Sequence, residues 1–135
     1  MSKHWVLVAD AAGAKVYESD ALLEELTLVE ELTHVHDGKL PGAGHGAQEA
    51  HHDPHVVAEG RFARAVAKFV NEDRHRFDRL VVVAPPRFLG DLRGELSQAV
   101  GNRVVASIHH DWTKLHTREL AAKVRANLPD VAGMP

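Results

Sequence analysis

The chain of 135 residues contains no cysteine, and this absence excludes several classes of protein. Disulfide-stabilised scaffolds, zinc sites built on thiolates and cysteine nucleophiles all require that residue. No apolar run approaches the roughly 18 residues that a membrane-spanning helix needs. No secretory signal precedes Trp5, where a strand-like apolar run already begins. We therefore expect a cytoplasmic protein with no membrane partner.

Two catalytic signatures are missing as well. The nucleophile elbow Gly-x-Ser-x-Gly does not occur, and the only serines are Ser2, Ser19, Ser97 and Ser107. The glycine-rich residues 42–46 (GAGHG) lack the Gly-Lys-Ser/Thr ending of a phosphate-binding loop and do not directly follow a buried strand. Little therefore supports triad or phosphate-loop chemistry, and we expect no bound cofactor.

The net charge of −3 conceals an uneven distribution. Residues 1–60 carry 3 Lys/Arg against 11 Asp/Glu, whereas residues 61–135 carry 13 against 8, and ten of those thirteen are arginine. The planar guanidinium binds phosphate through two donors, so the basic half is compatible with a surface that faces RNA. The alternative is that helices carry solvated arginines on their outer faces. From charge alone, the alternative is the simpler interpretation.

The first third of the sequence predicts three strands. Residues 5–9 (WVLVA) form a continuous apolar run, typical of a strand that is buried on both faces. Turn residues lead into 14–18 (AKVYE), which alternates like a returning strand. Residues 26–35 predict a third strand, although a helical stripe through Leu22, Leu26 and Val29 is the alternative. Residues 37–53 then show no periodicity and predict a long, flexible loop, which in a small domain is usually functional or disordered.

The remainder predicts alternating helices and strands. Asp53-Pro54 is typical of a helix start, and an apolar stripe at helical spacing follows it. Residues 80–84 and 104–108 predict buried strands, separated by a helix from Pro86 to Gly101-Asn102, and Thr117 predicts the cap of a last helix. The order β-β-β-α-β-α-β-α describes one α/β domain over residues 1–135. Its antiparallel meander is followed by crossovers, which gives a mixed sheet covered by helices.

Functional groups are expected beyond the carboxyl ends of parallel strands. If the first, fourth and fifth strands are parallel, one edge gathers Asp10, the turn at residues 85–90, and His109, His110 and Asp111. Carboxylates and imidazoles at one edge could hold a divalent metal, as in a ribonuclease-H-like hydrolase. Only two carboxylates are available, however, and Asp111 could equally be the N-cap of a helix that begins at residues 112–114.

The histidines provide a second, weaker candidate for a metal site. His51 and His55 are four residues apart, the spacing that presents two ligands on one helix face. Pro54 lies between them and is expected to begin the helix, so His51 should fall outside it. No third ligand completes a tetrahedral set.

Four segments carry a more specific signal. They are residues 5–17 (WVLVADAAGAKVY), 62–65 (FARA), 80–93 (LVVVAPPRFLGDLR) and 110–114 (HDWTK), the last followed by Glu119-Leu120. Together they resemble the bacterial host-attachment protein family over nearly the whole chain. The resemblance implies a ribonuclease-H-like mixed sheet, similar to the middle domain of archaeal and eukaryotic peptide release factors. It also implies relatives among ribosome-rescue and ribosome-hibernation factors.

The release-factor comparison draws attention to the loop at residues 37–53. Release factors carry Gly-Gly-Gln at this place, and Gly46 and Gln48 match the first and last residues of that tripeptide. Ala47 replaces the second glycine, and its Cβ penalises a left-handed backbone by roughly 1 kcal/mol or more. The match has two interpretations, descent and chance. We therefore do not expect this chain to share the peptidyl-tRNA hydrolysis of release factors.

Three hypotheses result. The first is a non-enzymatic protein that docks on RNA or the ribosome, with Gly46, Gln48 and the loop histidines at the tip and Arg61, Arg64, Arg87 and Arg93 on phosphates. The second is a metal-dependent hydrolase that uses Asp10 and Asp111. The third is a protein-interaction module, homodimeric in one version, that uses the acidic half and affects attachment indirectly.

Overall fold

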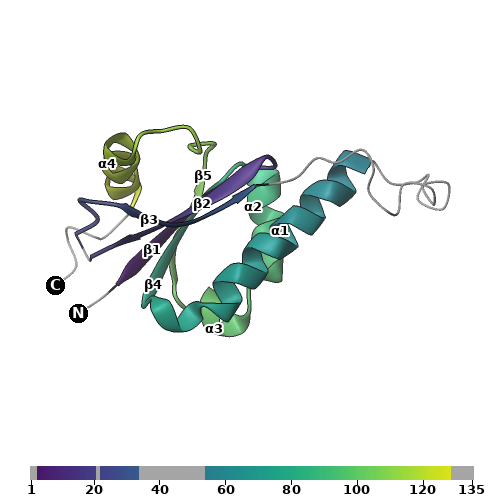
Figure 1. Cartoon of the computed structure of the whole chain (residues 1–135), viewed down its shortest axis with the longest axis horizontal. Helices are drawn as coiled ribbons and strands as arrows, with labels where there is room; N and C mark the ends of the chain where they lie inside the picture. The colour runs from purple at the N-terminus through teal and green to yellow at the C-terminus, as the bar shows by residue number, and fades with distance from the viewer. Residues whose placement is uncertain (1–2, 21, 34–53, 129–135) are drawn as a thin grey trace.

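The computed structural model describes residues 3–20, 22–33 and 54–128, apart from the side chains of residues 54–56. Five strands in this part form one sheet in the order β3-β2-β1-β4-β5 (Figure 1). In chain order the elements are β1 (His4–Ala9), β2 (Gly13–Ser19), β3 (Thr27–Thr33), α1 (Pro54–Glu72), the 3-10 helix η2 (Arg74–Arg76), β4 (Arg79–Ala84), α2 (Pro86–Glu95), α3 (Gln98–Gly101), β5 (Val104–His109) and α4 (Thr117–Asn127).

The strand directions match the predicted mixed sheet. β1 pairs with β2 and β2 pairs with β3 in antiparallel fashion, so the first three strands form the meander. β4 runs parallel to β1, and β5 runs parallel to β4, as crossovers through helices require. The third strand is confirmed over the helical alternative, and α1 begins at Pro54 as predicted. The α/β fold class is therefore confirmed.

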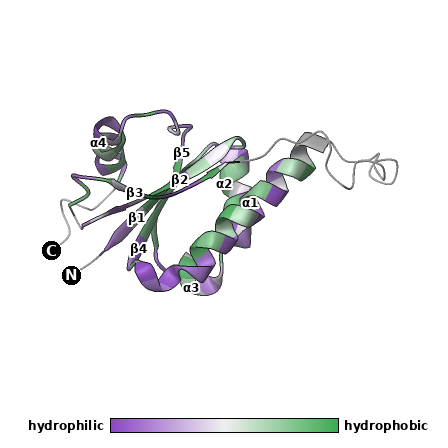
Figure 2. Cartoon of the chain, viewed as in Figure 1, coloured by the Kyte–Doolittle hydropathy of each residue, from purple (hydrophilic) through white to green (hydrophobic). Residues whose placement is uncertain are grey.

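β1 and β4 lie at the centre of the sheet and bury side chains on both faces. All six residues of β1 are buried, and all residues of β4 after Arg79 are buried. Since successive side chains of a strand point to opposite faces, these two strands supply two separate cores. In Figure 2 they are coloured apolar except near their starts, whereas the covering helices alternate between apolar and polar residues.

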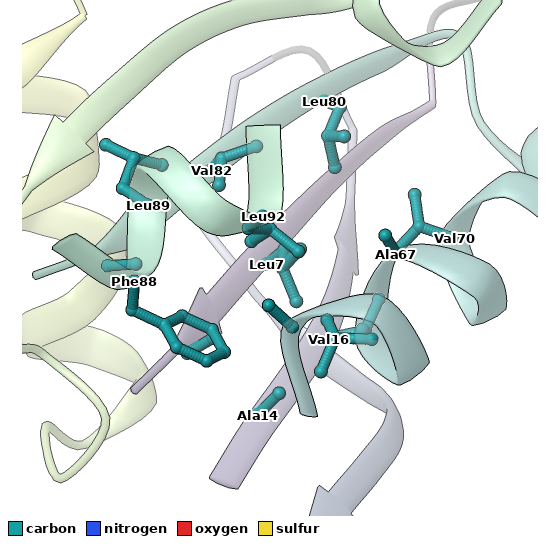
Figure 3. Close-up of a cluster of buried hydrophobic side chains, with 14 of the residues drawn as sticks. Leu7, Ala14, Val16, Ala67, Val70, Leu80, Val82, Phe88, Leu89 and Leu92 are labelled. Carbon is teal, nitrogen blue, oxygen red and sulfur yellow. The ribbon is translucent and has the colours of Figure 1, made fainter. Parts of the chain in front are cut away.

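The first core lies between the sheet and the helices α1 and α2. Trp5, Leu7 and Ala9 point into it from β1, and Leu80 and Val82 point into it from β4. α1 contributes residues at spacings of three and four, and α2 contributes three more (Figure 3). The helical members are Phe62, Ala63, Val66, Ala67 and Val70 of α1 and Phe88, Leu89 and Leu92 of α2.

The second core lies on the opposite face, beneath α4. Val6 and Val8 of β1 and Val81 and Val83 of β4 meet Leu120, Val124 and Leu128 there. Leu23, from the connection between β2 and β3, is fully buried in the same core and has a positive φ of 56°. The sheet is thus enclosed by helices on both sides.

The helix predicted to run from Pro86 to Gly101-Asn102 is interrupted, so that prediction is wrong in part. α2 ends at Glu95 because Leu96 is extended, with φ −72° and ψ 139°. Ser97 then acts as the N-cap of α3 and accepts a hydrogen bond from the backbone N–H of Val100 (3.2 Å). A serine that begins a new helix is a recognisable signal, but the apolar positions around it concealed the break.

The side chain of Asn71, on α1, forms hydrogen bonds to both sides of this break. Its side-chain amide donates to the carbonyl of Glu95 (3.1 Å), and its side-chain oxygen accepts from the backbone N–H of Ser97 (2.9 Å). One side chain therefore satisfies a helix-terminal carbonyl and a loop N–H that α2 and α3 leave unpaired.

The cap of the last helix also differs from the prediction. Thr117 is the first residue of α4, and the N-cap position belongs to His116, whose side chain makes no capping hydrogen bond. The backbone N–H of Leu120 donates to the carbonyl of His116 (2.8 Å) and begins the regular helical pattern.

Replacing Asn71 with alanine should destabilise the fold. Asn71→Ala removes both hydrogen bonds across the break, and we expect the free energy of unfolding to fall by about 1–3 kcal/mol. Asn127→Ala is the matched control, because Asn127 donates only to Lys123 within its own helix. Urea unfolding of both variants tests this, and equal losses would contradict the bridging role of Asn71.

The raised pKa of Tyr17 leads us to expect a loss of stability at alkaline pH. Its burial and, to a lesser extent, the negative charge of Glu31 raise the pKa of the Tyr17 phenol above its ordinary value. The unfolded chain therefore releases this proton at a lower pH than the folded chain. Stability contributed by this group should be present below about pH 10 and decline above it. Tyr17 is the only tyrosine, so absorbance titration reports it directly, and Tyr17→Phe should reduce the alkaline loss.

Candidate functional site

The carboxyl ends of the three parallel strands meet at one edge of the sheet, as predicted. Val8 of β1 is in register with Val83 of β4, which is in register with Ile108 of β5. Asp10 therefore follows β1, and Pro85 follows β4, at the edge where β5 ends in His109. In open α/β sheets this edge is the usual position of a site.

Asp10 and Asp111 approach each other through a third residue, Thr113. The Thr113 hydroxyl lies 2.9 Å from one carboxylate oxygen of Asp10 and 3.0 Å from one of Asp111. The backbone N–H of Thr113 also donates to Asp111 (3.5 Å). Asp111 thus caps the turn at Thr113 and not a helix.

The second carboxylate oxygen of Asp10 is engaged by the turn between β1 and β2. It accepts from the backbone N–H groups of Ala12 (2.8 Å) and Gly13 (3.0 Å), and the N–H of Asp10 donates to the carbonyl of Gly13 (2.9 Å). Such bonds are typical of an aspartate that shapes a turn. Both oxygens of Asp10 therefore hold the local structure.

The candidate metal ligands share an edge but do not converge. Within residues 3–20, 22–33 and 54–128, no three side chains of histidine, aspartate or glutamate come together in a group suited to a metal ion. His109 is exposed, and the His110 ring stacks on Trp112 instead of pointing toward Asp10. The geometry therefore gives the hydrolase hypothesis no added support.

Lys15 and Trp112 belong to this edge as well, although the sequence resemblance that includes them assigned them no role there. The ammonium of Lys15 donates to the carbonyl of Thr113 (3.3 Å), a contact between residues 98 positions apart. Trp112 packs partly against the second core. The segment after β5 is therefore tied to the β1–β2 hairpin from two directions.

Arg61 and Arg64 lie on the exposed side of α1. They line a groove of about 310 Å³ between α1 and α2, together with Asp91 and Glu95 of α2. Arg64 forms an ion pair with Glu95 (3.5 Å), but 72% of its side chain stays exposed. Lys68 is also exposed, so Arg61, Arg64 and Lys68 form a cationic stripe at spacings of three and four.

Arg87 and Arg93 lie on different sides of α2. Six residues apart, they are separated by about 240° around the helix axis. Arg87 is exposed in the first turn, whereas the Arg93 guanidinium donates to the Ser107 hydroxyl of β5. Arg87 and the cationic stripe share the helical layer over the first core, and Arg93 is directed toward the β5 edge.

Several predicted site residues lie outside the described part of the chain. Gly46, Ala47, Gln48 and His51 fall there with the rest of the segment 37–53, and the proposed cap Asp53 does too. His55 belongs to the first turn of α1, but its side chain is not among those described.

The family of the chain is decided by a match to a known family model. The model described as "Protein required for attachment to host cells" matches residues 5–124. The chain belongs to this family. In this host-attachment protein, helices cover both faces of the sheet, and Asp10, Thr113 and Asp111 meet at its carboxyl edge.

Solved structures of other proteins match this chain at low sequence identity. An archaeal protein superposes with a TM-score of 0.52 at 10% identity, over 92% of this chain and 38% of that one. An archaeal translation termination factor gives 0.42 at 10% identity, over 92% and 38%. A Ppx/GppA phosphatase from Aquifex aeolicus gives 0.39 at 14% identity, over 81% and 36%. The host-attachment chain spans less than two fifths of each of these proteins.

A search of curated proteins finds no significant sequence match. None of the helices in the described ranges combines the length and the apolar character that crossing a bilayer requires.

Removing the Thr113 hydroxyl should loosen the edge. Thr113→Val keeps the shape of the side chain but deletes its bonds to Asp10 and Asp111, and we expect the free energy of unfolding to fall by about 1 kcal/mol. Thr27→Val on the exposed strand β3 is the control and should change stability by less than about 0.5 kcal/mol. If the two variants are equally stable in urea, the Thr113 hydroxyl contributes nothing to the free energy of unfolding.

Proposed function

We propose that this protein binds structured RNA, with the ribosome as its first candidate, and acts as a binding factor and not as a hydrolase. The observation that carries the proposal is that few of its arginines form an ion pair with a carboxylate. All ten lie between Arg61 and Arg125, and among the described residues only Arg64 and Arg76 form ion pairs with a carboxylate. Within the described ranges, the other eight guanidinium groups form no direct ion pair with a carboxylate.

Several of these guanidinium groups are fixed by neutral acceptors. Arg103 donates to the carbonyls of Arg74 and Phe77, the latter at 2.9 Å, and Arg125 donates to the carbonyl of Leu23 (2.8 Å). A carbonyl positions an arginine without cancelling its charge. The result is a set of positioned cations, which suits a polyanion whose phosphates supply most of the binding energy.

The helical layer of α1 and α2 is the part of this surface that we assign to RNA. Arg61, Lys68 and Arg87 are exposed and have no ion-pair partner in the described ranges. The Arg64–Glu95 pair is largely exposed, and such pairs contribute little to stability, so Arg64 can exchange its carboxylate for a phosphate. α1 also directly follows the segment 37–53, whose Gly46 and Gln48 we propose to approach the same RNA.

The ribosome is the RNA to test first because the resemblance to the host-attachment family implies a domain similar to the middle domain of peptide release factors. A cytoplasmic location is part of this proposal, since ribosomes reside there. The attachment role in the family description would then be an indirect consequence of a change in translation.

Charge reversal on the helical layer provides the test. Arg61→Glu combined with Arg87→Glu should weaken co-sedimentation with ribosomes at least about tenfold and lower the salt slope of log K by about 2, one unit for each phosphate contact. Arg79→Glu combined with Arg118→Glu is the control, because it changes the charge equally away from this layer.

Two outcomes would contradict the proposal. If wild-type protein does not sediment with ribosomes or bind structured RNA even at low salt, the function is wrong. If the control pair weakens binding as much as the Arg61 and Arg87 pair, the assignment to the α1–α2 layer is wrong.

A further inference from the structure

The connection between β5 and α4 presents two stacked rings at the surface. The rings of His110 and Trp112 lie nearly parallel, with centroids 4.9 Å apart and planes inclined by 6°. His110 is exposed, whereas Trp112 is half-buried against the second core. The stack therefore reaches solvent through His110. This connection is seen above the sheet in Figure 1, between the labels β5 and α4.

The stack is held in place by its neighbours. Thr113, the next residue, hydrogen-bonds to the Asp10 carboxylate and receives the ammonium of Lys15 on its carbonyl. Trp112 gains further support from the core side chains that it contacts. The rings are thus fixed before any ligand arrives, which reduces the entropy lost on binding.

Positive charge lies beside the stack. The ammonium of Lys123, on α4, is 5.9 Å from the centroid of the Trp112 ring. An exposed ring on a rigid base with a cation nearby is the combination that single-stranded RNA uses, because a base stacks on the ring while a phosphate approaches the cation.

We propose that the outer face of the His110–Trp112 stack binds an unpaired nucleobase of RNA. This inference rests on the proposed RNA-binding function and adds a base-contacting site to the phosphate-contacting arginines. The site lies at the carboxyl edge of the parallel strands, on the side of the sheet covered by α4, so it is distinct from the α1–α2 layer. An RNA that engages both would fold around this edge of the sheet.

The test compares RNA that has bases with a polymer that has only the backbone. Affinities are measured for a single-stranded oligoadenylate and for an abasic oligonucleotide of the same length. His110→Ala should weaken binding of the oligoadenylate about tenfold, the effect expected for the loss of one base–aromatic stack. Its affinity for the abasic polymer should not change, since that polymer offers only phosphates.

Two variants serve as controls for this measurement. His109→Ala removes an exposed imidazole next to the stack and should leave both affinities unchanged. His110→Phe keeps a stacking surface without the imidazole nitrogens and should restore oligoadenylate binding. His109 and His110 are both exposed, so near-wild-type thermal unfolding is expected for all three variants.

The outcomes separate this inference from the function on which it rests. If His110→Ala and His109→Ala bind oligoadenylate equally while Arg61→Glu with Arg87→Glu weakens it, the nucleobase site is wrong and the RNA-binding function stands. If the wild-type protein binds neither polymer at low salt, both are wrong. If a tryptophan-containing peptide binds in a His110-dependent manner and oligoadenylate does not, the stack belongs to a protein partner and the inference is overturned.

Discussion

The two central strands of the sheet have no solvent-facing side, and most of the architecture is a response to that constraint. β1 and β4 send alternate side chains into two cores, so each face of the sheet must be covered by apolar residues from elsewhere. α1 and α2 cover one face and α4 covers the other (Figure 1). Parallel pairing of β1 and β4 needs a crossover, and α1 supplies it. The carboxyl edge, with its turn residues and exposed rings, is a consequence of this arrangement.

Local patterns predicted the elements of the fold well. The apolar runs at residues 5–9 and 80–84 identified the central strands, because only a strand buried on both faces remains apolar at every position. Proline at the start of α1 and α2 located two helix beginnings. The break between α2 and α3 was missed because Leu96 and Val100 continue an apolar pattern. What decides the break is Asn71, a side chain 26 residues before Ser97.

The candidate site was predictable only in part. Strand order placed Asp10, His109, His110 and Asp111 at one edge, since it follows from topology. Thr113 and Lys15 could not be found in this way, because their contacts join residues about a hundred positions apart and depend on side-chain reach. The same holds for the arginines. Composition shows that ten are present, but only geometry distinguishes Arg64, which faces a carboxylate, from Arg103, which faces two carbonyls.

β3 is an outer strand of the sheet among the described residues, and the backbone of such a strand could pair with the same strand of another molecule. An antiparallel pairing of two copies centred on Glu30 would place the two Glu30 side chains opposite each other on one face of the sheet. Like charges that face each other across a strand pair oppose the pairing. The exposed carboxylate of Glu30 thus opposes this edge-to-edge pairing of two copies at neutral pH.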